Sequence, residues 1–216
     1  MNEIIKIKDV TRFLEEWAPL SYQESYDNAG LLTGDASAEV RGVLVTLDCT
    51  EGVVEEAIRL GCNLIVAHHP ILFKGLKKLT GSTYVERTII KAVKHDVAIY
   101  AIHTNLDNVH TGVNKKLAER IGLKNLKILA PKSGTLSKLV TFIPKENADA
   151  VLSALHEAGV GQIGHYKNCS FRVEGTGTFM PDESAKPHVG KSLTQEYVDE
   201  VRAEVIFPSH LVQAIK

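Results

Sequence analysis

Two patterns of apolar residues alternate along residues 1–125. The first is helical: apolar side chains recur three or four residues apart at Val10, Phe13, Leu14 and Trp17, which predicts an amphipathic helix over residues 9–17. The second is a short, continuous apolar run, which is typical of a buried strand. Such runs lie at residues 42–48, 63–67 and 98–102. Further helices are expected at residues 50–60, 83–95 and 111–121.

The alternation of strands and helices predicts an α/β fold. Strands this apolar, separated by helices of about ten residues, favour a parallel-type sheet with helices on both faces. We therefore expect an α/β domain over residues 1–130.

A second region follows the Pro131-Lys132-Ser133-Gly134 segment, which is expected to be a linker. A strand is predicted at residues 138–143, a helix at 147–158, a hairpin around 169–179 and a strand at 198–206. The Gly175-Thr176-Gly177 segment suggests a bulge or a close backbone approach. With a second helix beginning near Ser209-His210, a β-α-β-β-α unit without a closing strand predicts an incomplete ferredoxin-like α+β domain over residues 136–216.

Composition and charge exclude several classes of protein. With 44% hydrophobic and 24% charged residues, the chain is expected to fold as an ordinary globular protein. The net charge of −1 gives no general basic surface for nucleic acid. No apolar run approaches the roughly 20 residues of a membrane span, and the first residues do not resemble a signal peptide. Three scattered cysteines are typical of reduced thiols, so a cytoplasmic protein is expected.

Three predicted strands end in residues that can bind metal. These are Asp48, the pair His68-His69, and His103 with Asp107. Because ligands of open parallel sheets bind outside the carboxyl ends of the strands, we expect these side chains at one edge. Imidazole and carboxylate suit zinc, iron, manganese or nickel.

The adjacent histidines suggest more than one ion. Neighbouring side chains of an extended chain point in opposite directions, so His68 and His69 are not expected to chelate one ion side by side. They could instead serve two ions about 3.5–4 Å apart, with Pro70 stiffening the turn behind them.

Structural roles compete with this interpretation. A single histidine at a strand end, such as His103, is usually structural. Asp48 suits a helix cap or an outer partner of a ligand. Asp27 and Asn28 fit a loop or an Asx turn, with a substrate role for Asn28 as the alternative.

The candidate residues lie in segments that resemble the Nif-three-like family, whose members are commonly named GTP cyclohydrolase 1 type 2 homologs. Four segments carry the resemblance: Asp27-Asn28-Ala29-Gly30-Leu31, Thr46-Leu47-Asp48-Cys49-Thr50, Ala67-His68-His69-Pro70 and His103-Thr104-Asn105-Leu106-Asp107. The second region is similar to the inserted domain of the longer bacterial members, itself similar to trimeric signalling or CutA-type modules. Its matching segments are Tyr166-Lys167-Asn168-Cys169-Ser170-Phe171 and Gly175-Thr176-Gly177-Thr178-Phe179.

The resemblance implies an α/β fold, a toroidal homohexamer and a site for two divalent metal ions. It implies His68, His69 and Asp107 as metal ligands. From their positions, His103 is a candidate fourth contact or outer partner, and Asp48 and Asn28 are candidate outer or substrate contacts. The family's other ligands, a His and a Glu in a GHxxxE-like motif, have no match in this sequence. We therefore expect either a fragment of a longer protein or a truncated form with an incomplete site.

Two functions follow from the resemblance. The first is a metal-dependent, hydrolase-like protein that opens the purine ring of GTP or acts on a related nucleotide or heterocycle. The second is a non-enzymatic scaffold or sensor that binds a metal or a small ligand. Neither a nucleic-acid nor a membrane partner is expected.

Overall fold

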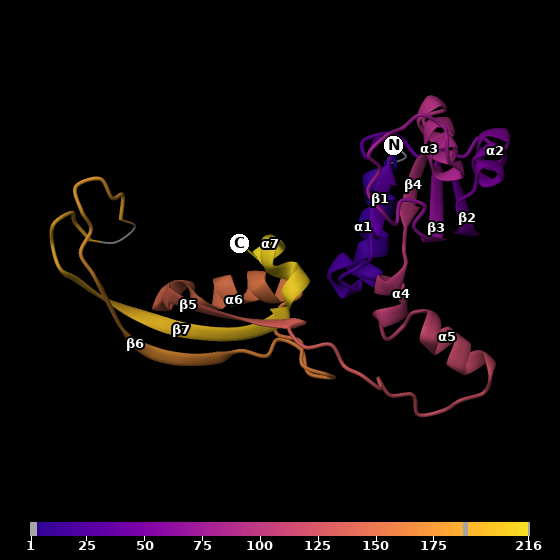
Figure 1. Ribbon diagram of the computed structural model, residues 1–216. Coiled ribbons are helices and arrows are strands. Elements are labelled where there is room, and N and C mark those ends of the chain that lie inside the picture. Colours follow the sequence, from indigo (N-terminus) through magenta and orange to yellow (C-terminus); the bar gives the residue numbers. More distant parts are fainter. Residues whose placement is uncertain (1–3, 188–189, 216) are drawn as a thin grey trace. The chain divides into compact units, whose positions relative to one another are not determined.

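The computed structural model describes residues 4–187 and 190–215 (Figure 1). The chain divides into two compact units, one up to residue 129 and one from residue 130. Each unit has its own sheet and its own core.

The first unit contains four strands and five helices within the described residues. In chain order they are α1 (Ile7–Trp17), β1 (Gly30–Thr33), β2 (Val43–Asp48), α2 (Glu51–Arg59), β3 (Leu64–His69), α3 (Tyr84–Lys94), β4 (Ala98–Ala101), α4 (Thr104–Asn108) and α5 (Val113–Arg120). A 3₁₀ turn at Leu20–Tyr22 follows α1. Helix α2 begins where Thr50 accepts a hydrogen bond from the Val53 N–H, and α3 begins in the same way at Thr83.

The sheet of this unit is mixed, with the strand order β1-β4-β3-β2. Strands β2, β3 and β4 run parallel, as predicted, but β1 pairs antiparallel with β4. The expectation of a purely parallel-type sheet was therefore wrong at this edge. Strand β1 has only four residues and enters from a loop, not from a crossover helix, so no parallel connection precedes it.

Helices cover both faces of the sheet because successive residues of β3 point to opposite sides. Leu64 and Val66 pack in the core beneath α1. Ile65 and Ala67 pack in a second core with residues of α2 and α3. Packing in these two cores fixes the orientation of β3, and with it the position of the histidines at the end of the strand.

The second unit is a three-stranded antiparallel sheet with one face covered by α6. Its elements are β5 (Leu136–Pro144), α6 (Ala148–Glu157), β6 (Phe171–Phe179), β7 (Glu196–Pro208) and α7 (Val212–Ile215). The strand order is β5-β7-β6, and β7 pairs antiparallel with both neighbours. Leu152 of α6 packs against Val201, Val205 and Phe207 of β7.

The hairpin predicted around residues 169–179 is instead one strand, β6, which pairs with β7. The register is regular through Gly175 and Gly177, so the strand has no bulge there. The close approach at Gly177 comes from a side chain: a Cβ there would meet the carboxylate of Glu200, which would have to move aside. The ferredoxin-like description of this unit stays a prediction.

Among the described residues, no helix has both the length and the apolar character needed to cross a membrane.

Candidate metal centre

The topology brings the predicted metal ligands to one edge of the first sheet. The last pair between β3 and β4 is Ala67 with Ala101, so His68 and His69 extend beyond the end of β4. On the other side, Asp48 pairs with His69 in the parallel register of β2 and β3. His103 follows β4 by two residues and directly precedes α4.

Three imidazoles meet at this edge. His68, His69 and His103 each offer a ligand nitrogen, and these atoms all lie within 4.8 Å of one another. The ring centroids are 5.0 Å apart for His68 and His69, 5.3 Å for His68 and His103, and 5.6 Å for His69 and His103. Nitrogens that share one ion lie about 3–4 Å apart, so small side-chain rotations would bring this group around a metal.

Each of the three rings is held through its Nδ1 atom. The Nδ1 of His68 donates to the carbonyl of Ile102 at 2.8 Å. The Nδ1 of His69 lies 2.7 Å from Asp48 Oδ1, and the Nδ1 of His103 lies 2.9 Å from Asp27 Oδ1. Because carbonyl and carboxylate oxygens only accept, Nδ1 is the donor in each contact, and Nε2 is the nitrogen with the lone pair when the ring is neutral. This is how metal-binding histidines are oriented in proteins.

The side-by-side arrangement of His68 and His69 differs from the sequence expectation. At the strand end the two rings turn toward the same region, because His69 is drawn to Asp48 and His68 to the carbonyl of Ile102. Ligand nitrogens within 4.8 Å of one another do not decide between one ion and two, and the number of ions stays a prediction.

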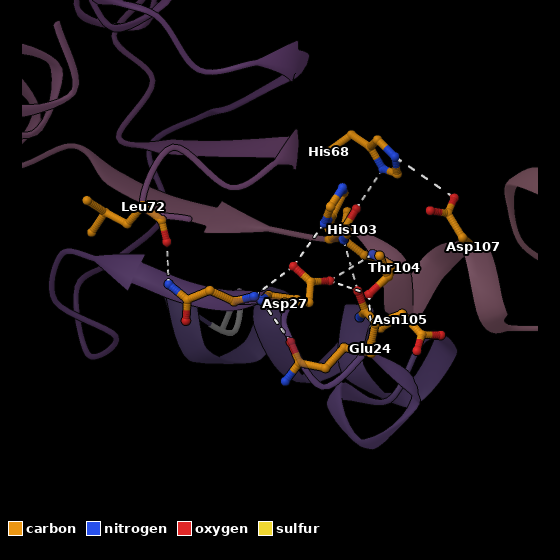
Figure 2. A network of polar contacts seen from close by, with 12 residues as sticks. Glu24, Asp27, His68, Leu72, His103, Thr104, Asn105 and Asp107 are labelled. Atoms are coloured by element: carbon orange, nitrogen blue, oxygen red, sulfur yellow. Dashed lines mark hydrogen bonds and ion pairs between the residues drawn. The ribbon is translucent and has the colours of Figure 1, made fainter. Parts of the chain in front are cut away.

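Asp107 extends the cluster from α4. Its Oδ1 lies 3.9 Å from Nε2 of His68, the nitrogen left free for a metal (Figure 2). Its side chain is 34% exposed, and its backbone carbonyl accepts a hydrogen bond from Asn114 at 2.9 Å. A carboxylate in this place suits a fourth ligand.

Asp27 contacts the cluster, although sequence reasoning assigned it to a loop. Its Oδ1 accepts from the Nδ1 of His103, and its Oδ2 accepts from the Thr104 N–H at 3.0 Å and from the Thr104 hydroxyl. Burial raises the pKa of Asp27, but the hydrogen bonds from Thr104 and His103 outweigh it and the pKa is lowered overall. The carboxylate therefore stays ionised. Asp27 and His103 are 76 positions apart in the sequence, so no local pattern could reveal the contact.

Asn28 and two aromatic residues surround the cluster. The side-chain amide of Asn28 donates to the carbonyl of Leu72 at 2.5 Å, which ties its loop to the segment after β3. The ring of Phe73 lies edge-on to His103 at 6.4 Å, and Tyr26 lies 6.3 Å from Phe73. Both aromatic rings are exposed, and they are inclined at 53° to each other next to the histidines.

The chain is similar to a group of bacterial proteins. A family model described as Duf34/NIF3 (NGG1p interacting factor 3) matches residues 5–176. Relatives named "GTP cyclohydrolase 1 type 2 homolog" occur in Halalkalibacterium halodurans (45% identical over 91% of the chain) and Bacillus subtilis (40% over 100%). A crystal structure of a Bacillus cereus protein related to NIF3 superposes with a TM-score of 0.82 at 41% identity, over 99% of the chain.

The match covers only part of each relative. The chain spans 53% of the Halalkalibacterium protein, 58% of the Bacillus subtilis protein and 57% of the Bacillus cereus chain. It therefore corresponds to little more than half of these proteins.

Proposed function

The chain belongs to the Duf34/NIF3 family, and we propose that it binds divalent metal ions and supports hydrolytic chemistry at the edge formed by β3, β4 and α4. The observation that carries this proposal is the shared orientation of His68, His69 and His103. Each ring is fixed through Nδ1, which leaves three Nε2 atoms as potential metal ligands.

The residues present fit a borderline divalent metal. His68, His69 and Asp107 would be ligands, and His103 would supply a further nitrogen. Three imidazoles and a carboxylate suit zinc, iron, manganese or nickel, and we propose two ions per site. Bound ions would provide Lewis acidity and lower the pKa of water. Around them, Asp48 and the Ile102 carbonyl orient two of the rings.

A nucleotide or a related heterocycle is the proposed substrate class. The relatives' name supports GTP as the first compound to test. The exposed rings of Phe73 and Tyr26 also support a planar substrate, because an aromatic surface beside His103 can stack with a base.

A non-enzymatic scaffold or sensor is the second candidate. The second unit contains a cavity of about 380 Å³ with mostly apolar walls, large enough for a small molecule. Phe179, Met180, Val198 and Glu200 contribute to its lining. In this case the first unit would bind metal without turnover, and the second unit would bind a ligand.

Self-association is also proposed, with the homohexamer of the family as the expected assembly. The β5-β7-β6 order with α6 on one face supports the partial ferredoxin-like description of the second unit. Light scattering coupled to size-exclusion chromatography measures the assembly. A cytoplasmic location is part of the proposal, and the three free cysteines agree with it.

Metal binding and turnover together distinguish the two candidates. The protein is loaded with zinc, manganese, iron or nickel and assayed against a nucleotide panel that includes GTP. Turnover that disappears in His68→Ala and His69→Ala supports the hydrolase. Bound metal without turnover of any nucleotide supports the scaffold, and failure to bind any of these metals contradicts the hydrolase and a metal-binding scaffold.

A further inference from the structure

We propose that Asp27 is a positioning residue of the metal centre, whose buried carboxylate holds the His103 ring with its Nε2 atom available to a metal. The inference rests on the proposed metal-binding function. It adds the loop before β1 to a site whose other residues follow β2, β3 and β4.

The carboxylate of Asp27 accepts hydrogen bonds from every side. Oδ1 accepts from the Nδ1 of His103 at 2.9 Å and from the Asn28 N–H at 2.7 Å. Oδ2 accepts from the N–H and the hydroxyl of Thr104 (Figure 2). The side chain is 0% exposed, so water does not compete for these donors. Such a carboxylate has little freedom to rotate, and it passes this constraint to the imidazole.

His103 needs an external support because the helix does not hold its ring. The residue lies just before α4 with φ −112° and ψ −116°, outside helical geometry, and its side chain does not cap the helix. Its backbone N–H donates instead to Asn105 at 2.9 Å. The contact with Asp27 therefore decides which ring nitrogen carries the proton, and a carboxylate can only accept it.

Thr104 anchors the carboxylate from behind. Its hydroxyl donates to Asp27 and accepts from the Glu24 N–H at 2.9 Å. This connection ties the 24–28 loop to the start of α4 through protein groups alone. The His103 ring is consequently oriented before any metal binds.

The isosteric variant Asp27→Asn tests this role. In this variant, an NH₂ group replaces one of the two carboxylate oxygens. Whichever oxygen it replaces, it faces groups that donate hydrogen bonds to Asp27 in the unmodified protein. When the NH₂ group faces His103, the imidazole can adapt by moving its proton to Nε2; when it faces Thr104, the hydroxyl can adapt by rotating, whereas the N–H groups of Asn28 and Thr104 cannot change. We therefore expect part of the variant population to carry the Nε2–H tautomer of His103, which cannot bind a metal through Nε2.

The measurement is the tautomer of His103 in metal-free, ¹⁵N-labelled protein at a pH of about 8, where a free imidazole is neutral. The expected result is an Nδ1–H ring in the unmodified protein and an Nε2–H signal in Asp27→Asn. Asp35→Asn serves as the control, because Asp35 accepts similar hydrogen bonds from Ser37 on an exposed turn. An Nε2–H ring in the unmodified protein, or an Asp27→Asn variant that changes neither the tautomer nor the zinc affinity, would overturn the proposal.

Zinc titration provides the second readout. Loss of an outer-shell partner typically weakens metal binding by about 10–100-fold, and we expect this for Asp27→Asn and no change for Asp35→Asn. If the unmodified protein binds no metal, the proposed function fails, while the tautomer measurement still decides the role of Asp27. If Asp27→Asn does not fold, the tautomer in the unmodified protein decides it.

Discussion

The Nδ1 atom of His69 lies 2.7 Å from Oδ1 of Asp48, across 21 residues of sequence. The parallel register of β2 and β3 places the two residues opposite each other at the strand ends. One strand therefore supplies the imidazole and its neighbour supplies the acceptor that fixes the ring. Asp48 acts here as a partner of His69, while Thr50 caps the helix that follows.

Replacing Asp48 with Asn is expected to weaken metal binding by about 10–100-fold with little effect on folding. The amide no longer fixes the His69 proton on Nδ1. The Asp48 side chain is 62% exposed, so its replacement leaves no buried group without a partner. Isothermal titration with zinc measures the change. Glu55→Gln, an exposed position of α2 that pairs with Lys91, is the control, and equal affinities in both variants would refute the role of Asp48.

Glu86 makes folding stability depend on pH at low pH. Its carboxylate accepts hydrogen bonds from Thr80, Ser82 and Thr83 at the start of α3, and the residue is only 7% exposed. Backbone and hydroxyl donors of Thr80 contribute most to lowering the pKa of Glu86 to about 2, from an ordinary value of 4.5. Because the folded pKa is the lower one, the stabilisation is complete above pH 4.5 and is lost as the pH falls toward 2.

Glu86→Gln should therefore remove part of this pH dependence. Urea unfolding at several pH values between 2 and 6 measures it, with Glu119→Gln on the exposed surface of α5 as the control. The free energy of unfolding of Glu86→Gln is expected to be lower than that of the unmodified protein at pH 6 and to change less toward pH 2. A curve parallel to that of the unmodified protein would contradict the assignment.

Cys49 is expected to resist alkylation in the folded protein. Burial raises the pKa of its thiol to about 11, and the residue is 3% exposed. Only the thiolate reacts, so iodoacetamide at a pH of about 8 should modify Cys62 and Cys169, which are partly exposed, before Cys49. Mass spectrometry of the peptides locates the adducts. Unfolded protein should react at all three cysteines, and early labelling of Cys49 in the folded state would be inconsistent with this structure.

Leu152 is the buried anchor of α6 in the second unit. It is 1% exposed, whereas its neighbour Val151 is 37% exposed. Leu152→Ala should lower the free energy of unfolding by about 2–5 kcal/mol, because it removes packed methyl groups and leaves a cavity. Val151→Ala should change it by less than about 1 kcal/mol. Urea unfolding, monitored by circular dichroism, measures the free energy of unfolding of both variants. A similar decrease in the two would argue against the packing of α6.

The elements with strong apolar patterns were predictable from the sequence. The continuous runs that form β2, β3 and β4 gave correct strands, and parallel pairing explained why residues after Asp48, Ala67 and Ala101 meet at one edge. Strand β1 was missed because four residues give no measurable periodicity. The chain near Gly175 was assigned to a hairpin because glycines also mark turns, whereas Gly177 makes room for Glu200.

The details of the site depended on contacts that the sequence does not encode locally. The proximity of the His68 and His69 rings accompanies the acceptor that each ring finds, the Ile102 carbonyl and Asp48. The contact of Asp27 with His103 joins a loop to a strand end that lies 76 residues away. Sequence patterns can predict which residue types reach the edge, but not which carboxylate holds which ring.

Metal content per chain tests the central claim most directly. The purified protein is incubated with zinc, manganese, iron or nickel, desalted and measured by inductively coupled plasma mass spectrometry, beside His68→Ala. His95→Ala is the matched control, because His95 is exposed at the end of α3 and bonds the Lys91 carbonyl. We predict about two ions per chain in the unmodified protein and in His95→Ala, and a large loss in His68→Ala. No bound metal in the unmodified protein, or equal content in His68→Ala, would contradict the account.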